Sequence, residues 1–276
     1  MSLLHCLGIG TLMGLIDRIR FLFDNRLIYV AAMPRSGSTF LAGMLSHGDE
    51  SLILREPGYA RGLFNNDQQF EQFDEIDLTL MTSCLNAPHG MLKVFKEEVY
   101  TKLKKRFGVV GVKECFHQNW NIYESYGFDV KYVTIVRDPR DIMLSTIEYG
   151  EQLEWHKEMW ADRSDEYIAE KHNESWSYIK EIIETRDTFK VRYEDLCTGK
   201  VDLEKLYGFC GIKCVTPKVD AGVFTSHSRG WEVDRHGVSL SDRTVLRWRE
   251  ESDAVNLSRA HNMYRLMDDY SSYWDY

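Results

Sequence analysis

The sequence predicts an α/β fold in three layers, with a central, mostly parallel sheet covered by helices on both faces. Apolar runs of strand length recur along the chain, and helical patterns fill most of the intervals between them. These runs occupy residues 27–32, 51–54, 109–113, 130–136 and 188–192. Strands that alternate with helices form parallel sheets, and strands buried on both faces are apolar throughout. No internal repeat or low-complexity segment is present, so we expect one domain over residues 1–276.

The charge balance excludes some partners. A formal net charge of −9 argues against nucleic acid or an anionic membrane as the main partner, because both interactions depend on surplus Lys and Arg. Basic residues still gather locally, at Arg35, at Arg137 with Arg140, and at Arg243–Arg249. Such clusters suit an anion pocket in an acidic protein, although each cluster alone is also typical of a solvated face.

The cysteines indicate neither a zinc site nor a redox dithiol, because the six are spread along the chain without a C-x-x-C pair. We expect free thiols and a cytoplasmic location. One disulfide among Cys197, Cys210 and Cys214 stays open, since they lie close in sequence. The apolar stretch Leu3–Ile16 is short and has no positive leader, which favours an amphipathic packing helix over a membrane-associated one.

The first apolar run leads directly into a turn with the sequence PRSGST. Leu27–Ala32 has the composition of a buried strand, and apolar residues with helical spacing follow the turn. They are Phe40, Leu41, Met44 and Leu45. The turn therefore joins a strand to the N-terminus of a helix.

This turn has the chemistry of a phosphate cradle. The first N–H groups of a helix have no partner inside it, the helix dipole favours an anion, and Gly37 permits close approach of the backbone. Three hydroxyl side chains add donors: Ser36, Ser38 and Thr39. Compared with the nucleotide loop G-x-x-x-x-G-K-[ST], Ala32 replaces the first Gly, Ser38 replaces the Lys, and the cation is Arg35. The pattern indicates a phosphorylated ligand other than magnesium-ATP; an ordinary polar loop is the alternative.

A second strand-to-helix junction has the sequence VRDPRDIMLS. Asp138 is suited to cap a helix and Pro139 to occupy its first turn. Arg137 closes the strand, and Ser145 follows eight residues later, about two helical turns on. Together they suit a second phosphate. Alternatively, Arg137 forms a salt bridge and Ser145 only fills the helix.

With both junctions in view, the sequence resembles sulfotransferases that use 3′-phosphoadenosine 5′-phosphosulfate (PAPS) as donor. The family's first motif, P-[KR]-S-G-[ST]-[ST]-[WFL], fits Pro34–Phe40, and its second, an R-D-P-R-D turn with a Ser eight residues after the first Arg, fits Arg137–Ser145. A Y-E-D-L segment begins at Tyr193, and residues 241–250 resemble a basic, Trp-containing helix of bacterial and carbohydrate-directed members. The resemblance implies a P-loop-like fold with an N-terminal helical segment (1–24), a nucleotide-binding core (27–200) and a C-terminal helical part (201–276).

The resemblance also implies roles in binding the donor. Arg35 would neutralise charge on the departing phosphate, Arg137 and Ser145 would bind the 3′-phosphate, and Tyr193 would approach the adenine. The 5′-phosphate would be held by the backbone of Ser36, Gly37, Ser38 and Thr39. Phe40 would contact adenine or belong to the core, and Arg229, in the segment SHSRGW, partly matches an element that covers the 3′-phosphate.

The catalytic base stays open, because the Lys-x-His segment of aryl and steroid members has no clear counterpart. Carbohydrate-directed and protein-tyrosine members often use a Glu after the first motif, and Glu56 lies 21 residues after Arg35. We favour Glu56. Glu114 or His117, after a later strand, is the alternative, with Lys113 assisting the donor; either carboxylate would otherwise be a surface salt bridge.

The expected reaction transfers a sulfuryl group from PAPS to a hydroxyl or amine, leaving 3′-phosphoadenosine 5′-phosphate (PAP), without a metal. The acceptor would be a carbohydrate or small metabolite, and residues 148–179, rich in Trp, Tyr and acid, are candidates to line its site. A P-loop phosphotransferase with Asp138 as a magnesium ligand is one alternative function, and a non-catalytic nucleotide-binding protein is another.

Overall fold

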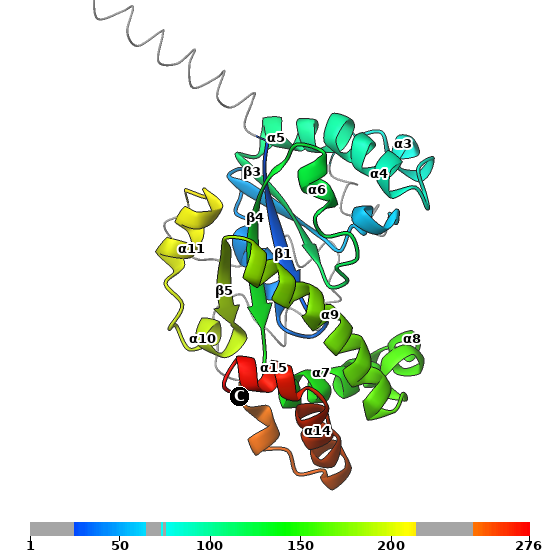
Figure 1. The fold of residues 1–276 in the computed structure, drawn as a ribbon, viewed down its shortest axis with the longest axis vertical. Coiled ribbons are helices and arrows are strands. Elements are labelled where there is room, and N and C mark those ends of the chain that lie inside the picture. Colours follow the sequence, from blue (N-terminus) through cyan, green and yellow to red (C-terminus); the bar gives the residue numbers. More distant parts are fainter. Residues whose placement is uncertain (1–24, 65–72, 74–75, 214–244) are drawn as a thin grey trace, which may run out of the picture.

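A five-stranded parallel sheet forms the centre of the molecule (Figure 1). The computed structural model describes residues 25–64, 73, 76–213 and 245–276. The strand order is β2-β3-β1-β4-β5. The strands are β1 (Arg26–Ala32), β2 (Ser51–Arg55), β3 (Val109–Glu114), β4 (Asp129–Val136) and β5 (Thr188–Arg192). Each of the five predicted strands is confirmed, with ends within a residue of those expected.

Helices cover both faces of this sheet, because the strand residues alternate between two apolar cores. In β1, Tyr29 belongs to one core and Val30 to the other. The helices are α2 (Ser38–Leu45), α3 (Leu78–Thr82), α4 (Pro88–Val94), α5 (Thr101–Arg106), α6 (Ile122–Ser125), α7 (Pro139–Gln152), α8 (Glu154–His156), α9 (Asp165–Thr185), α10 (Tyr193–Cys197), α11 (Leu203–Cys210), α14 (Ala254–Leu266) and α15 (Asp268–Tyr273). The Tyr29 core includes residues of α4 to α7, α9, α14 and α15, whereas the Val30 core includes α2, α10 and α11. The three-layer prediction is confirmed.

Four short helical turns complete the described elements. A 3-10 turn, η1 (Tyr59–Arg61), follows β2, and a π-helical turn, η3 (Phe95–Tyr100), joins α4 to α5. A second π-helical turn, η4 (Lys157–Ala161), continues α8, and a 3-10 turn, η6 (Arg247–Arg249), precedes α14.

The carboxyl ends of the three central strands meet at one edge of the sheet. Ala31 of β1 pairs with Glu114 of β3 on one side and with Thr134 of β4 on the other. In Figure 1 these ends point toward the part of the molecule where α7, α8, α14 and α15 gather. Parallel α/β sheets bind ligands at this edge.

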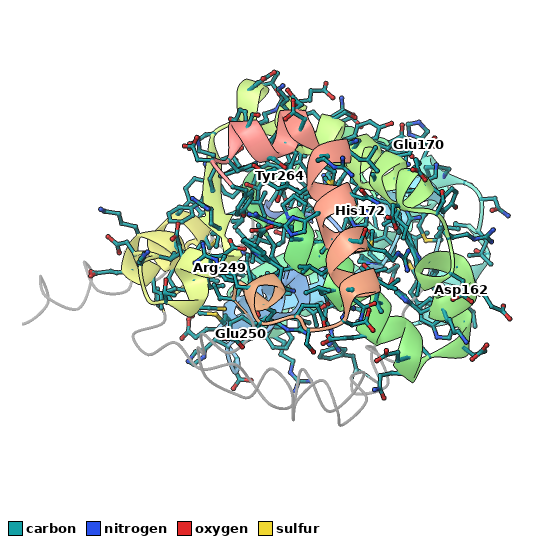
Figure 2. All side chains as sticks on the ribbon, turned by 90° about the horizontal axis from the view of Figure 1, so that it is seen from below. Asp162, Glu170, His172, Arg249, Glu250 and Tyr264 are labelled. Carbon is teal, nitrogen blue, oxygen red and sulfur yellow. The ribbon has the colours of Figure 1, made fainter. Side chains whose placement is uncertain are left out.

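The C-terminal helices brace the end of β4. In Figure 2, which looks onto this side, Tyr264 marks α14 and Glu170 marks α9. Arg259 of α14 donates a hydrogen bond to Asp165 at the start of α9, with Nε to Oδ1 at 2.7 Å. The hydroxyl of Tyr270 in α15 accepts from the N–H of Arg137 at 2.9 Å and donates to its carbonyl at 2.7 Å. These contacts fix the residue that closes β4.

Several sequence expectations fall outside the described residues or need correction. The stretch Leu3–Ile16 and the candidate Arg229 lie outside the described residues. The expected helix over residues 241–250 is wrong in its described part: Leu246 has a left-handed backbone (φ 56°), which interrupts an α-helix, and only η6 forms. The four described cysteines are free thiols. Among the described helices, none combines the length and apolar character needed to cross a membrane.

Candidate functional site

A pocket of about 290 Å³ opens at the carboxyl ends of β1, β3 and β4. This volume is at the lower end of the range for small-molecule sites. It is lined by Pro34, Arg35, Gly37, Ser38, Thr39, Phe40, Glu56, Lys113, Cys115, Phe116, Arg137, Ser145, Tyr149, Trp155, His156, Met159 and Trp160. The lining combines residues of the two junctions with side chains of α7, α8 and η4, and the Arg35 guanidinium lies 4.0 Å from the centre of the Tyr149 ring.

The residue at the centre of the β1–α2 turn must be a glycine. Gly37 has φ 87°, in the left-handed region. A Cβ at Gly37 would lie 2.2 Å from the ring of Tyr193, so a side chain there is also excluded by contact. Arg35 has φ 66°, a strained conformation for a residue with a side chain. The turn therefore stores strain where Arg35 enters the pocket.

The N-terminus of α2 is left uncapped. Gly37 occupies the N-cap position and no side chain there accepts a hydrogen bond from the first turn. Within the described chain, the other helices of eight residues or more are each capped by a side chain: α7 by Asp138, α9 by Ser164, α11 by Asp202 and α14 by Asp253. The first N–H groups of α2 thus need a partner from elsewhere, and an anion suits them.

The hydroxyl residues of this turn have different environments. Ser36 is buried and its Oγ donates to the carbonyl of Met33 at 2.7 Å, which holds the turn closed. Ser38 and Thr39 line the pocket. Phe40, in the first turn of α2, also lines the pocket and packs into the core that contains Val30. The predicted cradle residues therefore assemble, with Ser36 acting on the turn itself.

The β4–α7 junction is organised by side chains. Asp138 caps α7 by accepting from the N–H of Arg140 at 2.9 Å, and its carboxylate also pairs with the Arg140 guanidinium at 2.7 and 2.8 Å. Arg137 is buried and lines the pocket together with Ser145, two turns into α7. Asp138 has a structural partner and does not line the pocket.

The two junctions are joined directly. Nε of Arg35 donates to Oγ of Ser145 at 3.3 Å, and Nη1 of Arg137 donates to the carbonyl of Arg35 at 3.2 Å. The Arg137 guanidinium also lies 4.6 Å from the centre of the Tyr193 ring, which packs against Gly37. Residues about a hundred positions apart in sequence thus form one cationic cluster. The structure brings together the predicted Arg35, Gly37, Arg137, Ser145 and Tyr193.

Glu56 enters the pocket paired with Lys113. The Lys113 side chain is 1% exposed, whereas the Glu56 side chain is 45% exposed. Lys113 Nζ donates to Glu56 Oε1, and the Cys115 thiol lies 3.4 Å from the same oxygen. Burial would raise the pKa of Glu56, but the charge and hydrogen bond of Lys113 lower it below its usual value. The carboxyl group is therefore ionised at neutral pH.

The two alternative bases lie elsewhere. Along β3 the side chains alternate, so Lys113 lines the pocket while Glu114 points to the opposite face, where its Oε1 accepts from the N–H of Gly58 at 2.9 Å. Burial raises the pKa of Glu114 to about 8. His117 is fully buried, with Nε2 3.0 Å from the carbonyl of Ala32 and Nδ1 3.1 Å from the hydroxyl of Tyr29. Neither Glu114 nor His117 lines the pocket.

The part of the pocket lining that comes from α7, α8 and η4 is a wall of rings with one methionine. Tyr149, Trp155, His156, Met159 and Trp160 all come from the segment 148–179 that the sequence singled out. None of the acidic residues of that segment lines the pocket. Sequence reasoning missed Cys115 and Phe116, although continuing the alternation of β3 beyond Glu114 would have placed Cys115 on the side of Lys113. Within the described part of the chain, no group of three or more His, Cys, Asp or Glu residues is arranged to hold a metal.

Comparison with known proteins identifies the family. A family model described as "Sulfotransferase domain" matches residues 25–227. The sulfotransferase domain from the curacin biosynthetic pathway is similar in structure, with a TM-score of 0.58 at 15% identity, over 88% of this chain and 97% of that one. Mouse sulfotransferase SULT7A1 complexed with PAP gives a TM-score of 0.45 at 13% identity, over 89% of this chain and 88% of that one. A sulfotransferase from Alicyclobacillus acidocaldarius gives 0.44 at 15%, over 87% and 95%.

A search of curated proteins finds no match. At 15% identity, the likeness to the curacin-pathway domain shows the fold alone. The family model, however, covers well over half of the chain. The chain therefore belongs to the sulfotransferase domain family.

Proposed function

We propose that the protein transfers the sulfuryl group of PAPS to an acceptor hydroxyl, with Glu56 as the base. The observation that carries this proposal is the joining of the two junctions, in which Arg35 donates to Ser145 and Arg137 donates to the carbonyl of Arg35. One motif alone would suit any phosphate. Two anion-binding elements in contact suit a nucleotide that carries phosphate at both its 5′ and 3′ positions.

The residues present fit such a nucleotide. The uncapped N-terminus of α2 offers N–H groups to a 5′-phosphate, and the missing Cβ at Gly37 leaves the backbone open to close approach. Arg137 and Ser145, at the other junction, supply a cation and a hydroxyl for the 3′-phosphate. PAPS supplies the sulfuryl group for transfer.

Glu56 has the position of a general base. It is ionised and half-exposed, and it lines the pocket together with the cationic cluster and the wall of rings. Its pairing with Lys113 lowers its proton affinity. An anionic donor beside Lys113 would share the ammonium, weaken its hold on Glu56 and raise the proton affinity of the carboxylate. Donor binding would thereby activate the base.

These groups account for every bond and proton in the proposed transfer. The acceptor oxygen forms a bond to sulfur as the bond between sulfur and the 5′-phosphate oxygen breaks, and the acceptor proton passes to Glu56. Arg35 and the start of α2 stabilise the charge that builds on the leaving phosphate. The products are a sulfate ester and PAP.

The test is sulfate transfer from radiolabelled PAPS to a panel of phenols, alcohols and sugars, with the wild type and Glu56→Gln. We expect Glu56→Gln to bind PAP within about threefold of the wild type and to lose about 10²–10⁴-fold in kcat. Glu50→Gln, at an exposed site before β2, is the matched control and should retain full activity. Full turnover by Glu56→Gln would remove Glu56 from the mechanism, and tighter binding of magnesium-ATP than of PAP would contradict the donor assignment.

A further inference from the structure

Among the residues that the structure describes, three histidines are buried, and their surroundings differ. His117 has both ring nitrogens within hydrogen-bond distance of a partner. So has His172, whose Nδ1 lies 2.8 Å from the carbonyl of Ile168 and whose Nε2 lies 3.3 Å from that of Pro34. His156 is 6% exposed, yet its Nδ1 is enclosed without a hydrogen-bond partner in the described part of the chain.

An enclosed nitrogen without a partner is costly, and native proteins rarely keep one without a reason. His117 and His172 are core residues that do not line the pocket, whereas His156 does. The imidazole with the unsatisfied nitrogen therefore belongs to the wall of the pocket, beside the space that a ligand would occupy. A hydroxyl group suits it best, because a hydroxyl both donates and accepts and so matches either tautomer.

The surroundings of His156 are carbon-rich. Its ring meets Tyr149 edge-on with centroids 4.5 Å apart, and Trp160 lies nearly parallel to it at 6.4 Å. Trp155 and Met159 are 49% and 54% exposed, so apolar surface continues outward from the pocket. Burial, and after it the charge of Arg35, lower the pKa of His156 to about 4, which keeps the imidazole neutral.

We propose that His156 recognises a second hydroxyl on the acceptor, whose apolar ring system packs against Tyr149, Trp155 and Trp160. This proposal rests on the proposed function and names the acceptor class: a ring compound with one hydroxyl at Glu56 and another at His156. A polyhydroxylated sugar fits less well, because this wall has few polar groups and each unpaired hydroxyl would lose its hydration. Of the acceptors that the sequence left open, a carbohydrate or a small metabolite, this proposal favours a small apolar diol.

The test compares three kinds of acceptor: naphthol, the isomers of dihydroxynaphthalene, and methyl glucoside. Each is assayed with the wild type, His156→Phe and His156→Gln. Dissociation constants in the presence of PAP, from tryptophan fluorescence, give a readout independent of turnover. A diol can react through either of its two hydroxyls, so its kcat/KM and affinity are first divided by two. After this correction, the best diol should exceed naphthol about fivefold in both quantities, which is the gain expected of one hydrogen bond. His156→Phe should abolish this preference, while His156→Gln, which keeps a donor and an acceptor, should retain part of it.

The matched control is His89→Phe, at an exposed histidine that does not line the pocket, and it should keep the diol preference. The absence of a diol preference in the wild type would overturn the proposal, whether or not the variants fold. So would a preference that survives in His156→Phe, or better transfer to methyl glucoside than to any naphthol. If PAP binds and naphthol is sulfated, these results leave the proposed function intact. Failure of the wild type to bind PAP would contradict the proposed function itself and the inference with it.

Discussion

The two strand-to-helix junctions share a topology and differ in what they offer a ligand. Both follow central strands, β1 and β4, that pair in parallel and end at the same edge. At the β1–α2 junction the helix has no side-chain cap, and the residues of its first turn line the pocket. At the β4–α7 junction Asp138 caps the helix, and its own N–H donates to Glu194 at 2.8 Å. Only side chains, Arg137 and Ser145, reach the pocket there.

This difference shows how one fold makes two kinds of anion site. A backbone site needs a glycine and a helix start without its own cap, so it accepts any phosphate that fits. A side-chain site needs a helix that is already satisfied, so that an Arg and a Ser can be aimed at a defined position. We therefore expect the first junction to drive chemistry and the second to select the nucleotide.

Removal of the Arg35 cation should give the largest effect. Arg35→Ala should lower kcat about 10²–10³-fold, as does the loss of one charge-stabilising group in other active sites, and weaken PAP binding much less. Single-turnover transfer from PAPS to naphthol would measure it, with Arg106→Ala, at an exposed site on α5, as the matched control. A loss confined to donor affinity would contradict the division of labour between the junctions.

A methyl group at the centre of the first junction should be the next most damaging change. Gly37→Ala combines a left-handed backbone with a contact of 2.2 Å to Tyr193, so we expect PAP binding to fall at least tenfold and stability to fall by about 1–3 kcal/mol. Calorimetry and urea unfolding would measure the two. Gly208→Ala in α11, where a Cβ meets nothing within 4 Å, should be neutral or stabilising. Unchanged PAP affinity in Gly37→Ala would show that the backbone of this turn does not bind the nucleotide.

Loss of the cap at the second junction should affect stability more than chemistry. Asp138→Ala removes the cap of α7 and the partner of Arg140, and we expect a loss of about 1–2 kcal/mol in the free energy of unfolding. Asp138→Asn keeps a capping oxygen and should recover much of it. If Asp138→Ala left stability unchanged but abolished magnesium-dependent nucleotide binding, a phosphotransferase would replace the sulfotransferase account.

Substitution of Glu114 in the neighbouring strand β3 should have the smallest effect on activity and stability at neutral pH. The Glu114 carboxyl, with its pKa raised to about 8, is protonated in the native state at neutral pH. Its contribution to stability is complete below its ordinary pKa near 4.5 and is lost as the pH rises through 8. We expect Glu114→Gln to flatten the fall in melting temperature between about pH 5 and 8 without changing kcat. An equal fall in the variant would mean that Glu114 is already ionised.

The sequence predicted the five strands, the start of α7 at Pro139 and the residues of the two junctions that assemble at the pocket, because each depends on local signals: apolar runs, a Pro after a capping Asp, a Gly-containing turn. It favoured Glu56 over Glu114 as the base only through the family resemblance, because the residues themselves do not show which carboxylate faces the pocket. Lys113 and Glu114 are adjacent in sequence, and only the pleat of β3 places them on opposite faces. The wall of rings was visible only as composition, because its partner Phe116 comes from a different part of the chain.

The most direct test of the central claim is a calorimetric comparison of PAP with adenosine 5′-monophosphate, which lacks only the 3′-phosphate, on the wild type and Ser145→Ala without magnesium. If the second junction selects the nucleotide, PAP should bind at least tenfold more tightly than the monophosphate to the wild type. Ser145→Ala should weaken PAP about threefold to tenfold and leave the monophosphate unchanged. Equal affinities of the wild type for the two nucleotides would contradict the account.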